Sequence, residues 1–127
     1  MMDNFALIID DSRAIRMTLA RFLQTLGFAS KEFEDAETAV TWLREGNSAM
    51  LALVDWNMPG MAGLGFLREI RGDSQFDNMA IMVITSDTSL ATMEKAFSLG
   101  VDEYLMKPIT RESVQAKLEM LGFSWES

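Results

Sequence analysis

The sequence predicts an α/β fold, a doubly wound parallel sheet of five strands covered by five helices. Short apolar runs alternate with segments whose apolar residues recur at helical spacing, and the alternation occurs five times along the chain. The central runs are almost continuously apolar, which is typical of strands covered on both faces. A length of 127 residues fits one domain. Because no linker or low-complexity tract interrupts the pattern, we expect residues 1–127 to form a single domain.

Five short runs are predicted to be the strands of this sheet. In chain order they comprise residues 5–9, 29–33, 50–54, 80–84 and 103–106. The third and fourth runs contain only apolar residues, so we expect these strands to be central and buried. The second run, Ala-Ser-Lys-Glu-Phe, is the weakest prediction because its middle three residues are polar.

The helices are predicted from apolar residues at helical spacing and from the residues that begin or end each segment. Gly27 ends the first helix, Asp35 and Gly46 bound the second, Gly100 ends the fourth, and Thr110 caps the fifth. The apolar residues that mark the five helices are, in order, Ile15, Leu19, Phe22, Leu23 and Leu26; Ala36, Ala39, Val40 and Leu43; Leu64, Leu67 and Ile70; Leu90, Met93 and Phe97; and Val114, Leu118 and Leu121.

The expected strand order is 2-1-3-4-5, the flavodoxin-like arrangement. Right-handed crossovers between parallel strands leave few topologies, and this order is common for a chain of this size. Ligands of open α/β sheets bind at the carboxyl ends of the strands near the point where the order reverses. Polar residues that could form a site follow strands one, three, four and five, which are neighbours in this order.

Composition excludes several classes of function. A formal net charge of −8 argues against nucleic-acid binding and suits a divalent cation or a basic protein partner. The chain has no histidine, which excludes histidine-based catalysis, histidine metal ligation and a phosphohistidine on this chain. It also has no cysteine, no apolar run long enough to span a membrane, and no signal-peptide pattern at its start. We therefore expect a soluble, cytoplasmic protein without nucleic-acid or membrane partners.

Three carboxylates are predicted to share one pocket: Asp10 and Asp11 after the first strand and Asp55 after the third. Ionised carboxylates repel one another, so they require a counter-charge, and Mg²⁺ with oxygen ligands is the natural one. Either of the first two aspartates could instead cap the first helix, as could Ser12. Taken together with Asp55, the metal interpretation is favoured.

The same edge of the sheet offers groups for phosphoryl chemistry. The carboxylate of Asp55 is a usable nucleophile, which would give an aspartyl phosphate. Lys107, held extended before Pro108, could neutralise charge, and Thr85 could donate to an oxyanion. Taken singly, the lysine has a simpler explanation as a solvated side chain, and the threonine as an ordinary strand residue.

At this point the chain resembles the response-regulator receiver domains, in particular the single-domain, CheY-like chemotaxis type. The resemblance covers essentially the whole chain and rests on these residues: Ile8-Ile9-Asp10-Asp11-Ser12, Asp55-Trp56-Asn57-Met58-Pro59-Gly60, Thr85-Ser86, Tyr104 and Lys107-Pro108. It implies that Asp55 is the phosphoacceptor. It also implies that Asp11, Asp55 and the Asn57 carbonyl hold Mg²⁺, with Asp10 acting partly through water, and that the Lys107-Pro108 bond is cis.

The resemblance further implies how such a domain would switch. Thr85 would move toward the phosphoryl oxygens and Tyr104 would turn inward, reshaping the face formed by the fourth helix, fifth strand and fifth helix. Asn57 and Asp87 lie where the family tunes the water that removes the phosphoryl group. One departure is Ala62, where the family commonly has an aspartate that caps the third helix; its absence should loosen the loop after Asp55 without altering the chemistry.

The implied partners are a sensor histidine kinase or phosphotransfer protein upstream and a protein target downstream, such as a flagellar motor switch or a kinase. The domain would not be an enzyme beyond its own phosphorylation and dephosphorylation, and we expect a monomer. A phosphohydrolase of the haloacid-dehalogenase kind is disfavoured because Asn57 stands where a second aspartate is required. A pseudo-receiver scaffold is disfavoured by the complete residue set, and a dinucleotide binder by the absence of a glycine-rich first turn.

Overall fold

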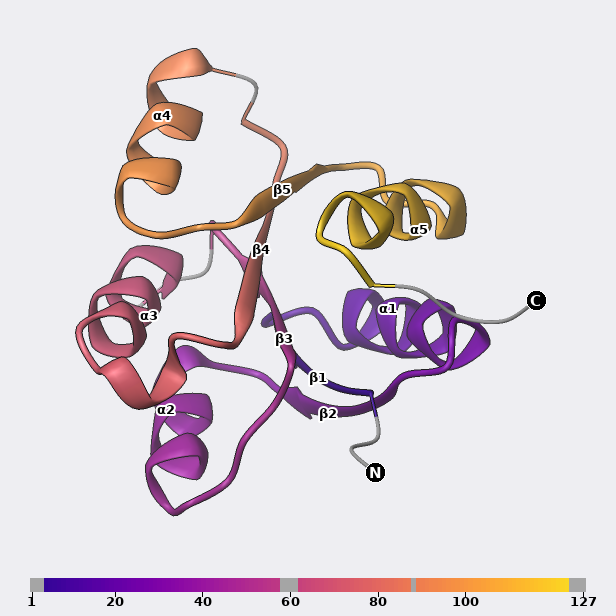
Figure 1. Ribbon diagram of the computed structural model, residues 1–127. Coiled ribbons are helices and arrows are strands. Elements are labelled where there is room, and N and C mark those ends of the chain that lie inside the picture. The colour runs from indigo at the N-terminus through magenta and orange to yellow at the C-terminus, as the bar shows by residue number, and fades with distance from the viewer. Residues whose placement is uncertain (1–3, 58–61, 88, 124–127) are drawn as a thin grey trace.

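The computed structural model describes residues 4–57, 62–87 and 89–123, which form one parallel sheet flanked by helices (Figure 1). The sheet order is β2-β1-β3-β4-β5, which confirms the predicted topology. The elements are β1 Phe5–Ile9, α1 Arg13–Thr25, β2 Ala29–Phe33, α2 Ala36–Arg44, β3 Leu51–Asp55, α3 Ala62–Arg71, the short 3₁₀ helix η1 Ser74–Phe76, β4 Ala80–Thr85, α4 Leu90–Ser98, β5 Glu103–Met106 and α5 Arg111–Met120.

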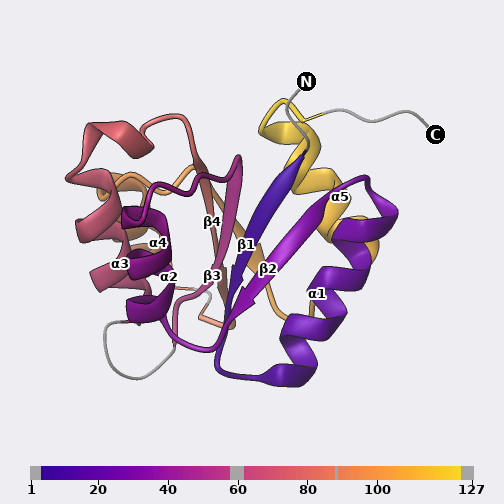
Figure 2. The same cartoon turned by 90° about the horizontal axis from the view of Figure 1, so that it is seen from below.

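Helices cover both faces of the sheet. In Figures 1 and 2, α1 and α5 lie on one face, and α2, α3 and α4 lie on the other. Alternate residues of each strand point to opposite faces, so β1 sends Leu7 and Ile9 to the core under α2 and α3, and Ala6 and Ile8 to the core under α1 and α5. Every residue of β3 is buried, as expected for the central strand of such a sheet.

Two strand predictions are wrong by one residue. The third strand runs from Leu51 to Asp55 rather than from 50 to 54, and the fourth extends to Thr85. The parallel ladder causes both shifts, because Leu51 pairs with Ala80 and Asp55 pairs with Ile84. Strand pairing therefore continues past the apolar run and includes the first polar residue. The other three strands have the predicted bounds.

The predicted helix caps are largely confirmed. The side chain of Asp35 accepts a hydrogen bond from the Thr38 amide, and Thr110 forms a reciprocal capping box with Ser113. At α1 the cap is Ser12, whose hydroxyl accepts from the Ile15 amide. Neither of the neighbouring aspartates has this role, so the alternative explanation for them is removed.

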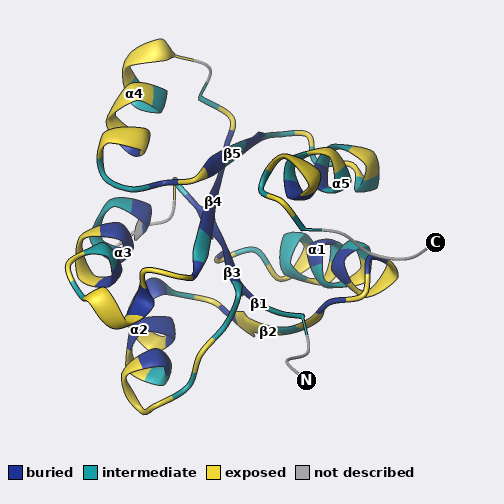
Figure 3. Ribbon diagram, in the orientation of Figure 1, coloured by how far each residue is buried: buried dark blue, intermediate teal, exposed yellow. Residues whose placement is uncertain are grey.

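In two helices, apolar residues that mark the helical spacing are not buried. In α4, Leu90 is 70% exposed and Phe97 is 42% exposed, and the one fully buried residue described in this helix is Ala96. The helix flanks the edge strand β5, where the sheet gives it little surface to pack against (Figure 3). In α3 the inward residue of the first turns is Phe66, and Leu64 is only half-buried.

Candidate functional site

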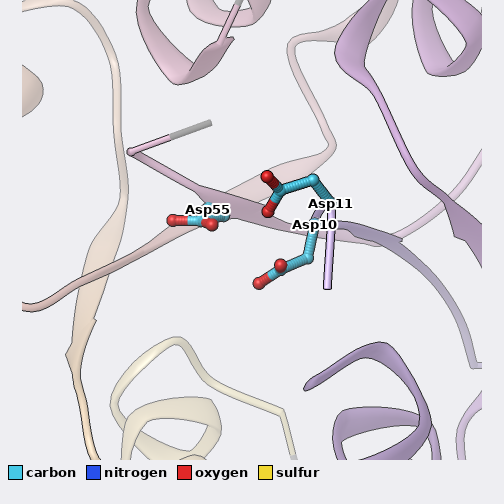
Figure 4. A group of neighbouring side chains, drawn as sticks. All are labelled: Asp10, Asp11 and Asp55. Atoms are coloured by element: carbon cyan, nitrogen blue, oxygen red, sulfur yellow. The ribbon is translucent and has the colours of Figure 1, made fainter. Parts of the chain in front are cut away.

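The acidic cluster lies where β1 and β3 end side by side. Ile9 pairs with Val54, so the residues that follow them, Asp10 and Asp55, emerge at the same edge of the sheet. A carboxylate oxygen from each of Asp10, Asp11 and Asp55 lies within 4.8 Å of the others. Figure 4 shows the three side chains gathered beside the ends of these strands. The predicted convergence of these carboxylates is confirmed.

Asp10 is the most deeply buried member of the cluster. It is 1% exposed, and one carboxylate oxygen accepts from the Ser12 amide at 2.8 Å. The other oxygen, Oδ2, is buried and has no hydrogen-bond partner among the described residues. Burial, together with repulsion from Asp55 and Asp11, raises the pKa of Asp10 to about 6, although the Ser12 amide and Lys107 oppose the rise.

This donor set fits a hard divalent cation. The buried oxygen of Asp10 lacks a partner, and Asp11 is exposed, so the cluster offers inward ligands and a side open to retained waters. Magnesium prefers a few carboxylates together with water over a closed protein cage. A cation here would satisfy the unpaired oxygen and lower the pKa of Asp10.

Asp55 lies between the acidic cluster and a lysine. Its side chain is 5% exposed, and Oδ1 is 3.6 Å from the Lys107 Nζ atom. The same oxygen accepts from the Asn57 amide at 3.0 Å. The backbone of Lys107 is anchored to β4, because its amide donates to the Thr85 carbonyl at 3.0 Å. The Lys107-Pro108 peptide bond is cis, as the family resemblance implied. The chain thus supplies a fixed positive group beside the buried carboxylate of Asp55.

Thr85 is buried at the end of β4, and its hydroxyl oxygen accepts from the Asp87 amide at 2.9 Å. The Asp87 carboxylate accepts from the Ser89 amide and from the Thr92 hydroxyl, each at 2.8 Å. These hydrogen bonds lower the pKa of Asp87. Both carboxylate oxygens of Asp87 therefore accept hydrogen bonds from residues at the start of α4, so the Asp87 side chain is held against the N-terminal end of this helix.

Sequence reasoning placed Arg16 beside the site, in the stretch Arg13–Arg16 expected to face a kinase, but it missed the contact of Arg16 with the acidic pair and the role of Thr92. Arg16 extends from α1 and donates to the Asp10 carbonyl at 2.7 Å, while its Nε atom lies 3.4 Å from Glu32 on β2. It fixes the backbone that presents the acidic pair. Its position just over one helical turn after the cap was the available clue, because a long side chain there can reach back to the strand end.

Other predicted residues fall outside the cluster or outside the described residues. Tyr104 lies on β5 and contacts Phe97 of α4 and Lys117 of α5. The loop 58–61, which includes Met58-Pro59-Gly60, lies outside the described residues. Helix α3 begins at Ala62, and the residue before it, where a cap would lie, is also outside them. The effect predicted for Ala62 therefore stays a prediction.

Comparison with known proteins decides the family. The family model described as "Response regulator receiver domain" matches residues 6–119. The chain belongs to this family. CheY of Pseudomonas aeruginosa, a chemotaxis protein, is 34% identical over 116 residues, covering 91% of this chain and 93% of that protein. CheY-3 of Vibrio cholerae is 33% identical, with 91% and 88% covered. CheY1 of Helicobacter pylori is 33% identical, with 91% and 94% covered.

Solved structures agree with this assignment. The chemotaxis response regulator CheY4 of Vibrio cholerae has a TM-score of 0.87 and 26% identity, covering 94% of this chain and 99% of that chain. The Francisella response regulator 1452 receiver domain, at 20% identity and a TM-score of 0.82, shares the fold, covering 94% and 96%. This protein is a receiver domain of the CheY type, the class that serves two-component signalling. No helix in its described part is long and apolar enough to cross a membrane.

Proposed function

We propose that this receiver domain accepts a phosphoryl group on Asp55 from the phosphohistidine of a sensor kinase or phosphotransfer protein. The observation that carries the proposal is the setting of Asp55, a buried carboxylate with the carboxylates of Asp10 and Asp11 on one side and Lys107 Nζ at 3.6 Å. A structural aspartate would need one counter-charge. Asp55 has Lys107 as its counter-charge, and it also lies beside Asp10 and Asp11, whose carboxylates themselves require a cation.

The residues divide the work of phosphoryl transfer between them. One oxygen of Asp55 attacks phosphorus while the P–N bond of the donor phosphohistidine breaks, and the imidazole leaves with the partner protein. Lys107 balances the charge that develops on the phosphoryl oxygens. Thr85 keeps its hydroxyl proton available for a phosphoryl oxygen, because its oxygen acts as the acceptor for the Asp87 amide. Asp10, Asp11, Asp55 and the Asn57 carbonyl would hold Mg²⁺, which supplies further charge neutralisation when bound.

The output of the domain would be a change in protein binding. Thr85 and Tyr104 would shift between two arrangements and reshape the face of α4, β5 and α5, on which Leu90 and Phe97 are exposed. Relatives named as chemotaxis proteins support a target such as a flagellar motor switch, and a kinase is the other target considered. We further propose a cytoplasmic monomer that is not an enzyme beyond its own phosphorylation and dephosphorylation.

The proposal is tested by intact mass after incubation with Mg²⁺ and acetyl phosphate, with rapid acid quenching so that short-lived adducts survive. Wild type should gain one phosphoryl group and Asp55→Asn none. Asp77→Asn, which removes an exposed carboxylate near η1, is the matched control and should react as wild type does. An adduct on Asp55→Asn would refute the assignment. So would wild-type protein that shows neither an adduct nor release of inorganic phosphate.

A haloacid-dehalogenase-like phosphohydrolase is the competing function. Sustained turnover of small phosphate monoesters, abolished by Asp55→Asn, would favour it over signalling.

A further inference from the structure

The outer edge of β5 is covered by side chains of its own and of α5. In the described sheet β5 pairs with β4 alone, so its other edge has no neighbouring strand. An open edge exposes amides that can pair with another chain unless side chains cover them. Here the Tyr104 amide donates to the Glu103 Oε1 atom at 3.0 Å, so the strand uses its own carboxylate to cover the edge.

Glu103 requires a cation, and Lys117 provides it. The residue is only 8% exposed, and carboxylates this buried are almost always paired. Lys117, on α5, places Nζ 3.2 Å from Oε1, the same oxygen that receives the Tyr104 amide. The pair therefore joins α5 to the backbone of β5 at Tyr104.

The lysine also reaches around the edge to the other face of the sheet. Glu103 and Leu105 share a face with α5, whereas Tyr104 points to the opposite face, because successive strand residues alternate. Even so, Lys117 Nζ lies 4.2 Å from the centre of the Tyr104 ring, within the range of a cation–π contact.

The ring is held on a second side by α4. Phe97 meets Tyr104 edge to face, with ring centres 6.1 Å apart and planes 84° apart. This is a favourable geometry for two aromatic rings. Tyr104 is thus restrained by side chains from both helices that flank the edge strand.

We propose that Glu103 and Lys117 form a clamp that positions Tyr104 and opposes the ring movement that phosphorylation drives. The clamp rests on the proposed function, since it assumes that Tyr104 moves when Asp55 is phosphorylated. If the Tyr104 ring moves away, it loses its contact with the Lys117 ammonium group. Lys117 cannot follow the ring without breaking its salt bridge to Glu103. Glu103 and Lys117 are positioning residues: they act through Tyr104 and touch no reacting group.

The expected effect is set by the strength of the contact. A partly exposed cation over an aromatic ring changes an equilibrium by about two- to fivefold. Because linkage is reciprocal, removing the clamp should strengthen binding of a phosphoryl analogue at Asp55 by the same factor. Beryllofluoride with Mg²⁺ is a suitable analogue because its binding is reversible.

Tyr104 is the one tyrosine in the chain, so fluorotyrosine labelling gives a single ¹⁹F probe at this position. Each labelled variant is titrated with beryllofluoride in Mg²⁺, and its half-saturating concentration is measured. The ring-flip rate of the same probe is measured without beryllofluoride. Lys117→Met leaves the Glu103 carboxylate buried without its cation, which could itself disturb the strand. The double variant Glu103→Gln/Lys117→Met removes that charge and is measured beside it. Lys95→Met removes the same charge at a residue of α4 whose side chain has no cation–π contact with Tyr104 among the described residues.

The clamp predicts that both variants lacking Lys117 lower the half-saturating concentration about two- to fivefold and speed ring flipping. Lys117→Arg, which keeps a cation over the ring, should stay close to wild type, as should Lys95→Met. Equal values for the double variant, Lys95→Met and wild type would overturn the clamp and leave the pair as a cover for the strand edge. If wild type fails to bind beryllofluoride, the proposed function fails instead, and the ring-flip rates still decide whether Tyr104 is clamped.

Discussion

Replacing Asp10 by asparagine should stabilise the metal-free protein. Burial raises the pKa of this carboxyl from 3.8 to about 6, so at neutral pH the folded protein holds a charge that the unfolded chain accommodates more easily. A rise of about two units corresponds to about 3 kcal/mol at about 1.4 kcal/mol per unit. The asparagine is nearly isosteric and uncharged, so Asp10→Asn should recover most of this free energy of unfolding.

The sign of the effect fixes its pH dependence. Between pH 3.8 and about 6 the unfolded chain has released the Asp10 proton while the folded protein retains it. Wild-type stability therefore falls as pH rises through this window, and the full loss is present above pH 6. The gain from Asp10→Asn should be small below pH 3.8 and reach its maximum above pH 6.

Urea unfolding in EDTA at several pH values measures this gain directly. Asp11→Asn is the matched control, since Asp11 is exposed, and its effect should stay within about 0.5 kcal/mol. In saturating Mg²⁺ the advantage of Asp10→Asn should shrink or reverse, because the wild-type carboxylate then has a cation. A loss of stability in Asp10→Asn at pH 7 in EDTA, or a gain that does not vary with pH, would refute the reasoning.

Three further substitutions test the surroundings of the site. Gly63→Ala should cost about 1–3 kcal/mol in urea unfolding despite its better helix propensity, because the new Cβ would lie 2.6 Å from Trp56 Cε3. Thr92→Val should raise the pKa of Asp87 measured by NMR titration, because it removes a donor that favours the charged form, whereas Thr92→Ser should leave it low. Arg71→Met should lower the free energy of unfolding by about 3–5 kcal/mol, since this 17%-exposed side chain donates to three backbone carbonyls and a carboxylate.

Each of the three has an outcome that contradicts it. Gly63→Ala with wild-type stability would mean that Trp56 moves aside freely. An unchanged Asp87 pKa in Thr92→Val would mean that the Ser89 amide alone holds the carboxylate. A loss below about 1 kcal/mol in Arg71→Met would place this arginine among ordinary surface residues.

The fold and most of the acidic site were predictable because they depend on local patterns. Apolar runs of strand length, helical spacing between them and capping residues specify the order of elements, and parallel strands bring their carboxyl ends to one edge. The meeting of Asp10, Asp11 and Asp55 follows from that geometry. The burial of α4 was not predictable, since Leu90 and Phe97 have helical spacing whether or not a sheet lies behind them.

The element order, the strand topology and the residues that reach the carboxyl edge of the sheet could be predicted from the chain alone, because periodicity and chain direction are properties of the chain. Three features became visible only in the folded protein: the Asp10 oxygen that lacks a partner, the binding of Asp87 to the start of α4, and the reach of Lys117 across the strand edge to Tyr104. These contacts depend on side-chain rotamers and burial, which are set by the packing of neighbouring elements. The spacing of residues along the chain therefore does not predict them.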